Sequence, residues 1–233
     1  MKNARNPLIV IAVVIVAVVG ISVPFLPRIA IKIFEEAYKL DVRYGELEKA
    51  SPVEMVFGGL IVTDRGMGIG TSAEHAVVNP VWNGLDPRKA MLAFDFSNVR
   101  FVKKAAEKDA SYNSLDGLVA LPFGSNWTYK KISGKVRTSH GDVTLKDFLA
   151  SSDDMKLSFD GTVTADMQID ATIKIFFAES LTKKVPPELA RMALNDEGGG
   201  WKSLSVKLEG NYDAPRIQVS SKLFRLKIGV KSK

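Results

Sequence analysis

The chain has 233 residues, a net charge of +6 and no cysteine, so disulfides and thiol chemistry are excluded in any compartment. A sequence of this length accommodates one β domain or two small domains. Part of the basic excess lies at the C-terminus, where neither a recognition helix nor an aromatic stacking platform accompanies it, which argues against a nucleic-acid partner.

The first predicted element is an apolar segment at residues 8–26, in which Ser22 is the only polar side chain. As a helix with a rise of about 1.5 Å per residue, it would span the hydrocarbon core of a membrane. A cleaved signal peptide is the alternative, but the run is long for one and no A-x-A-like site ends it. The sequence therefore favours an uncleaved anchor over residues 1–27, with anchor positions at Leu8, Ile15, Val19 and Phe25.

Residues 28–40 predict an amphipathic linker helix, because Ile33, Phe34 and Ala37 recur at helical spacing opposite charged residues. Such a helix suits either the membrane surface or one end of a sheet. The short basic flank before the anchor predicts an N-terminus in the cytoplasm, which places residues 41–233 on the far side of the membrane.

From residue 41 onward the chain predicts strands and turns. Gly58-Gly59 interrupts an alternating run and predicts a bulge. His140-Gly141 and Asp160-Gly161 each separate two apolar runs and predict hairpin turns.

Residues 162–177 alternate without interruption, and every odd position is apolar. This period of 2 predicts a single strand about 50 Å long, against a usual length of about 17–20 Å. A long strand with one apolar face must hide that face by curling, under helices or against a lipid.

The chain is predicted to end with a short helix and two strands. Pro187 begins a run of strong helix formers, and alternating strands follow at residues 201–209 and 216–229. We therefore expect a mainly β fold, in which an elongated, curled antiparallel β-sheet with one or two short helices follows the N-terminal transmembrane helix.

The apolar face of this sheet is the candidate functional surface. Its side chains could line a lipid groove or fill the core of a closed sandwich, and the sequence leaves both open. Phe159 is expected at one end of the surface. The expected lining residues are Met167, Ile169, Ile173, Ile175, Val206, Leu208, Phe224 and Leu226.

Basic residues near the C-terminus form a second candidate surface. They suit a solvated edge strand whose lysines discourage aggregation, or a contact with anionic lipid headgroups. The headgroup candidates are Lys222, Arg225 and Lys227.

No constellation in the sequence predicts catalysis. The glycines of residues 66–70 lack a following helix, so a phosphate site is not expected. His75 and His140 have no partners at metal-ligand spacing. Asp166 and Asp170 would lie about 13 Å apart on one strand face, too far for paired acid–base work. We expect a protein that is not an enzyme and holds no metal or cofactor.

The order of these elements resembles a known family. The segment GTVTADMQIDATIKIFF, the short helix after it and the closing LSVKLEGNYDAPRIQVSSKLFRLKI are similar to the C-terminal region of AsmA-like proteins. The segment RYGELEKASPVEMVFGGLIVTD resembles the early strands of that family. The resemblance covers most of the chain and extends to short relatives such as the N component of type II secretion. The chain is far shorter than the long, bridge-forming members.

The resemblance implies a single-pass protein of the bacterial inner membrane with its bulk in the periplasm. It implies a curled β-sheet whose apolar face carries lipid acyl chains, and a role in envelope and outer-membrane biogenesis. The alternative is a non-enzymatic structural or assembly component of an envelope machine such as a secretion system. That component would bind a protein partner through a surface patch or an exposed strand edge.

Overall fold

The computed structural model describes residues 31–32, 35–36, 40–51, 53–65, 69–82, 90–103, 111–124, 127–211, 215–220 and 225–229. Within these ranges no helix is long and apolar enough to cross a membrane. The four anchor positions predicted at Leu8, Ile15, Val19 and Phe25 lie outside them. Of the predicted linker helix, residues 31–32 and 35–36 are described and helical.

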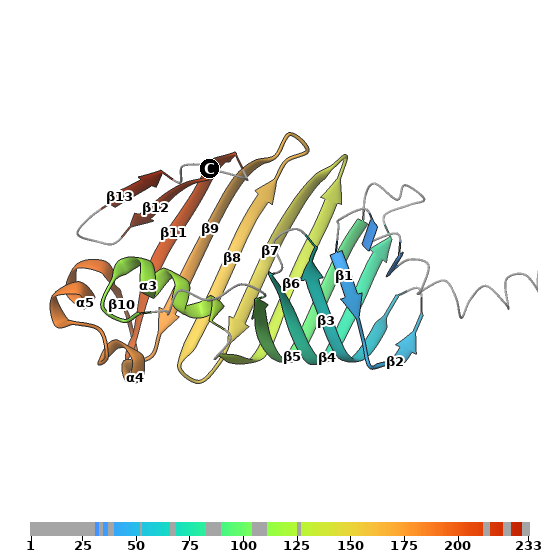
Figure 1. The fold of residues 1–233 in the computed structure, drawn as a ribbon, viewed down its shortest axis with the longest axis horizontal. Coiled ribbons are helices and arrows are strands. Elements are labelled where there is room, and N and C mark those ends of the chain that lie inside the picture. The colour runs from blue at the N-terminus through green and yellow to red at the C-terminus, as the bar shows by residue number, and fades with distance from the viewer. Residues whose placement is uncertain are drawn as a thin grey trace, which may run out of the picture.

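The described strands form one 13-stranded antiparallel sheet, in which most strands that are neighbours in sequence are also neighbours in space (Figure 1). The order is β1-β3-β4-β5-β6-β7-β8-β9-β11-β12-β13, with β2 beside β3 and β10 beside β11. The strands are β1 (Leu40–Arg43), β2 (Glu46–Ala50), β3 (Met55–Asp64), β4 (Ile69–Trp82), β5 (Ala90–Lys103), β6 (Thr128–Ser139), β7 (Asp142–Ser151), β8 (Met155–Val163), β9 (Gln168–Phe177), β10 (Asn195–Gly198), β11 (Trp201–Asn211), β12 (Arg216–Ser220) and β13 (Arg225–Gly229). The mainly β, antiparallel prediction is confirmed.

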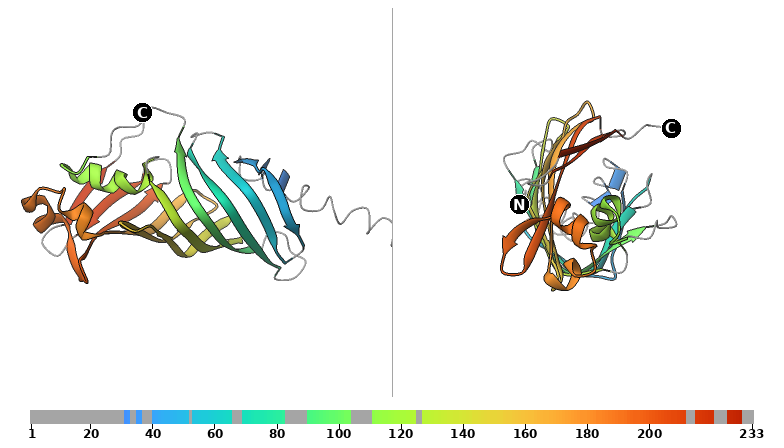
Figure 2. Two further views of the ribbon diagram at one scale, coloured as in Figure 1. Left: turned by 90° about the horizontal axis from the view of Figure 1, so that it is seen from below. Right: turned by 90° about the vertical axis from the view of Figure 1, so that its left-hand side faces the viewer.

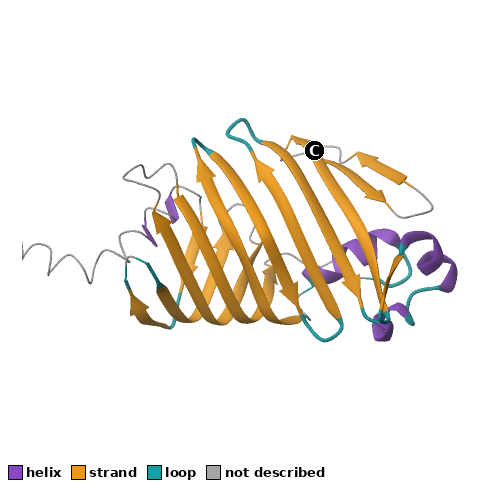
Figure 3. Ribbon diagram, turned by 180° about the vertical axis from the view of Figure 1, so that it is seen from behind, coloured by secondary structure: helices purple, strands orange, loops and turns teal. Residues whose placement is uncertain are grey.

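In the described residues that follow β1, three short α-helices and one 3-10 turn accompany the sheet: α3 (Leu115–Ala120), η1 (Leu121–Phe123), α4 (Glu179–Thr182) and α5 (Pro187–Ala193). Pro187 occupies the start of α5, so the predicted helix is confirmed. Helix α3 was not predicted. It begins where the Ser114 side chain accepts a hydrogen bond from the Gly117 amide at 3.1 Å. Figure 3, which views the sheet from behind, shows the helices gathered beyond it at one end.

The sheet curls, and the helices lie on its concave side (Figure 2). The strand register brings apolar residues of successive strands side by side on this face. One such row crosses the sheet from β3 to β11 through Phe57, Ala76, Phe96, Ile132, Ala150, Leu157, Ile175 and Leu204. The predicted curl therefore places the apolar side chains inside and the charged ones outside.

The interruption predicted at Gly58-Gly59 is present and extends over four strands. Gly59 has a φ of 65° and Asn98, on β5, a φ of 51°. Between them on β4 lies Glu74, whose carboxylate accepts a hydrogen bond from the Asn98 amide at 2.7 Å. Where β3 to β6 pass this irregularity, their apolar residues are spaced by three positions instead of two. The pairs are Phe57 and Leu60, Ala73 and Ala76, Phe96 and Val99, and Tyr129 and Ile132. The extra residue in each strand keeps the apolar face continuous as the sheet bends.

The single strand predicted at residues 162–177 is wrong, because the chain forms a hairpin there. Strand β8 ends at Val163, β9 begins at Gln168, and the Thr164 amide donates to the Gln168 carbonyl at 2.8 Å. The turn predicted at Asp160-Gly161 lies inside β8, whereas the one at His140-Gly141 is confirmed between β6 and β7.

The single strand predicted at residues 216–229 is also wrong. It consists of β12 and β13, which pair with each other antiparallel. Phe224, one of the expected lining residues, and Lys222, one of the headgroup candidates, fall between them and outside the described residues.

Tyr129 ties η1 to the sheet. Its side chain is fully buried, and its hydroxyl donates to the Pro122 carbonyl at 2.9 Å. Replacing Tyr129 with phenylalanine leaves this carbonyl without its partner, which we expect to lower the free energy of unfolding by about 1–3 kcal/mol. Urea unfolding at pH 7 measures the loss.

Burial also raises the pKa of Tyr129. A raised pKa in the folded state means that stability is complete below the unfolded-state value of about 10 and falls as the pH rises above it. We expect the wild type to lose more stability than Tyr129→Phe between pH 9 and about pH 11. Equal losses of stability in the two proteins would show that burial does not raise the pKa of the Tyr129 hydroxyl.

Candidate functional site

The candidate site is the apolar concave face of the sheet, and the expected lining residues divide on it by exposure. Ile169, Ile173 and Ile175 on β9 are 8%, 8% and 0% exposed, and Val206 on β11 is 1% exposed. Leu208, also on β11, is half-buried. The residues predicted on β9 and β11 therefore do share one face, and most of them are closed off from solvent.

One expected lining residue, Met167, lies off the strand face, whereas Leu226 keeps a position on it. Met167 belongs to the β8–β9 turn, with a φ of 61° and 42% exposure, so its assignment to the strand face is wrong. Leu226 lies on β13, where the register places it opposite Val219.

The helices close the face at the end formed by β8, β9 and β11. Tyr112, just before α3, and Lys184, between α4 and α5, lie close together, with the ammonium 5.5 Å from the ring centre. Segments far apart in sequence thus meet over this end. The buried residues that they add to the core are Leu118, Leu121, Leu181, Val185, Ala190, Ala193 and Leu194.

A row of phenylalanines occupies the same face on β5, β7 and β8, and we call Phe94, Phe96, Phe148 and Phe159 the aromatic row. Ring centres are 5.1 Å apart for Phe94–Phe96, 6.3 Å for Phe94–Phe148 and 6.4 Å for Phe148–Phe159. All four side chains are only half-buried. The aromatic row is therefore one part of the apolar face that remains partly open to solvent.

Gly134 on β6 makes room for this row. It lies opposite Phe94 in the register, and a Cβ built on it would lie 2.7 Å from Phe94 Cζ and 3.2 Å from Phe148 Cα. The rings of β5 and β7 thus meet across β6, and a side chain at this position would require the Phe94 ring to shift. From the sequence, only Phe159 of these four phenylalanines was expected on the candidate surface. A glycine within an alternating strand does not indicate that rings from the neighbouring strands occupy the space beside it.

The convex face is charged, and several of its ion pairs are exposed. Lys131 and Asp95 lie 2.6 Å apart, and Lys135 and Asp147 lie 2.8 Å apart, each pair linking neighbouring strands. The hydrogen bond and charge of Lys135 lower the pKa of the Asp147 carboxyl. Exposed pairs of this kind contribute little to stability, but they make this face hydrophilic.

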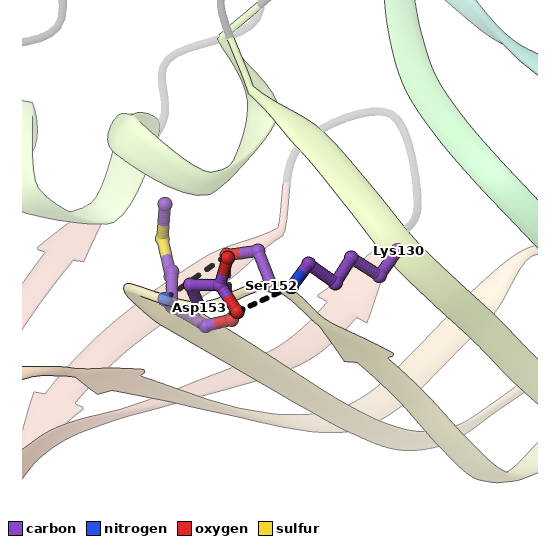
Figure 4. Close-up of polar contacts among 4 residues, drawn as sticks. Lys130, Ser152 and Asp153 are labelled. Carbon is purple, nitrogen blue, oxygen red and sulfur yellow. Dashed lines mark hydrogen bonds and ion pairs between the residues drawn. The ribbon is translucent and has the colours of Figure 1, made fainter.

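The close-up in Figure 4 draws the polar contacts at the β7–β8 turn, including the one from Lys130 on β6 to Asp153. Ser152 accepts from the Met155 amide and donates to its carbonyl, both at 3.0 Å. Lys130 reaches Asp153 across the turn at 2.6 Å, with both side chains mostly exposed. These contacts hold the turn in its conformation and engage the polar side chains of Lys130, Ser152 and Asp153.

The remaining candidates do not assemble into a reactive site. His75 lies 3.5 Å from Glu48 on the exposed face, and His140 contacts Ser139 at 3.1 Å in a hairpin turn. Among the described residues, no group of three or more histidine or carboxylate side chains could hold a metal ion. Of the headgroup candidates, Arg225 and Lys227 lie on the terminal strand β13.

Comparison with family models, with curated proteins and with solved structures gave no match to this chain.

Proposed function

We propose that this protein holds lipid acyl chains against its concave face and serves envelope or outer-membrane biogenesis, as its resemblance to AsmA-like proteins implies. The half-buried aromatic row carries the proposal, since it continues the buried apolar surface into a region that solvent or a ligand can reach. Each methylene of an acyl chain buried there would gain about 0.8 kcal/mol. No directional polar chemistry is needed for such binding.

The proposal places the protein in the bacterial inner membrane, anchored by residues 8–26, with residues 41–233 in the periplasm. Its support is the length of the apolar segment and the basic flank before it. Membrane lipid is the proposed partner, nucleic acid is not, and no enzymatic activity, metal or cofactor is proposed.

A structural or assembly role in an envelope machine is the second candidate. The observation in its favour is that Ile169, Ile173, Ile175 and Val206 are buried, so this part of the sheet is a filled core. The two roles differ in what lies against the aromatic row, which a direct chemical probe can identify.

Photocrosslinking from one position on each face tests the lipid proposal. A photoreactive phenylalanine analogue replaces Phe159, on the concave face, or Phe176, which lies on the opposite face of neighbouring β9 with Lys174 over its ring at 4.8 Å. We expect irradiation of intact cells to attach phospholipid at position 159 and not at position 176. Mass spectrometry of the purified full chain identifies the adduct.

The same experiment discriminates between the candidates. A protein adduct at position 159 would favour the assembly role. Equal lipid labelling at positions 159 and 176 would mean only that the membrane is near, and would remove the support for a specific lipid surface.

A further inference from the structure

In the described residues the sheet ends at β13 on one side and at β1 and β2, which both pair with β3, on the other. In the part of the chain that the structure describes, β2 pairs only with β3, and β13 pairs only with β12; each contains five residues. A strand edge presents backbone groups that can pair with another chain. On neighbouring β1 this capacity is reduced, because the Val42 amide donates to the Glu35 carboxylate at 2.8 Å.

Both edge strands, β2 and β13, have apolar residues at positions on the concave face of the sheet. On β2, Leu47 lies opposite Phe57 and packs against the core. On β13, the register places Leu226 opposite Val219 and Ile228 opposite Ile217, which are positions of the apolar face. A β13–β2 pair between two copies would therefore join concave face to concave face.

The edges carry opposite charges at their remaining positions. Strand β2 contributes Glu46 and Glu48, of which Glu48 lies 3.5 Å from His75, while its Lys49 is paired with Glu54. Strand β13 contributes Arg225 and Lys227 at the positions opposite Ser220 and Gln218, which belong to the convex face. Pairing the two edges would bring acidic and basic residues together on that face.

Strand direction decides how two copies can meet. All neighbouring strands are antiparallel, and β2 and β13 are separated by an even number of steps along the sheet, so they run in the same direction. A two-fold axis normal to the sheet would pair β13 with β13, or β2 with β2, and place like charges together. A head-to-tail operation, which combines translation with rotation because the sheet curls, would instead pair β13 with β2 of the next copy, in parallel.

We propose that copies of this chain associate head to tail, with β13 of one copy pairing in parallel with β2 of the next. Such an interface is heterologous and can add further copies. It extends the apolar concave face from one copy to the next. The proposal concerns the sheet edges and does not depend on lipid binding.

Cysteine crosslinking tests the interface directly, because the chain has no native cysteine. Full-length Glu46→Cys or Glu48→Cys is co-expressed with Arg225→Cys or Lys227→Cys under a second tag, and membranes are oxidised. We expect a mixed disulfide dimer in at least one of the four combinations. The matched control partner is Thr172→Cys, which is exposed on the convex face of the central strand β9.

Charge reversal supplies the second test. Glu46→Lys/Glu48→Lys and Arg225→Glu/Lys227→Glu should each weaken self-association of the full chain in detergent roughly tenfold, as two exposed ion pairs allow. Mixing the two variants should restore association between them to within about threefold of the wild type. Sedimentation velocity gives the dissociation constants.

The proposal is overturned if crosslinking to β13 positions is no stronger than to Thr172→Cys, if Lys227→Cys forms mainly dimers with itself, or if mixing the charge-reversed variants restores nothing. A wild type that stays monomeric at every concentration would overturn it as well.

Discussion

Replacing Ile175 with alanine is expected to lower the free energy of unfolding by about 2–5 kcal/mol. Ile175 is fully buried and lies between Leu157 on β8 and Leu204 on β11, which are 2% and 0% exposed. The helices close this end of the face, so the cavity left by the lost atoms cannot easily collapse. Urea unfolding followed by circular dichroism measures the change.

Thr172→Ala is the control for this variant. Thr172 lies on the same strand, but its side chain is on the exposed convex face beside Lys207. It should cost about 1 kcal/mol or less, as expected for a change in strand preference alone. If Ile175→Ala cost no more than Thr172→Ala, the concave end would have to be open instead of a packed core.

The hairpin at residues 164–167 shows why alternation alone could not fix strand length. Val163 pairs with Ile169, and both numbers are odd. Because an odd-numbered residue of β8 pairs with an odd-numbered residue of β9, the odd positions of both strands lie on the same face. The apolar pattern therefore continues unchanged through the turn. Alternation thus predicted correctly which residues share a face, but could not distinguish one long strand from two paired ones.

The helices and the aromatic row illustrate a second limit. Helix α3 is only six residues long, and a segment this short carries little periodicity. Its place over the far end of the sheet follows from packing between distant segments, such as Tyr112 beside Lys184. Likewise, the contact between Phe94 and Phe148 depends on Gly134 between them, a relation visible only once the register is known.

Part of the concave face is buried core and part is only half-buried, which limits the positions at which a substitution can test lipid binding. Ile169 and Ile173 are buried on β9, so aspartate at either position would place a charge in the core and unfold the protein. Phe148 is half-buried in the aromatic row, where a carboxylate can still reach water when no ligand is present. It is therefore the position at which folding and ligand binding can be separated.

If the concave face holds phospholipid as proposed, Phe148→Asp is expected to remove it, while Phe148→Leu retains it. A polar group facing an acyl chain without a hydrogen-bond partner costs about 1–3 kcal/mol and a carboxylate costs more, so binding should weaken by roughly 100-fold or more. Leucine preserves the apolar surface. Native mass spectrometry of the full chain in detergent counts the lipids that remain bound.

The control for lipid held by the proposed membrane anchor is Phe176→Asp, which places the same charge on the opposite face of β9, two strands from β7. Wild type, Phe148→Leu and Phe176→Asp should carry the same number of lipids, and Phe148→Asp should carry fewer with an unchanged circular dichroism spectrum. Equal lipid counts in all four proteins would mean that the bound lipid does not lie against the aromatic row. That outcome would favour the assembly role, in which a protein partner covers these half-buried rings.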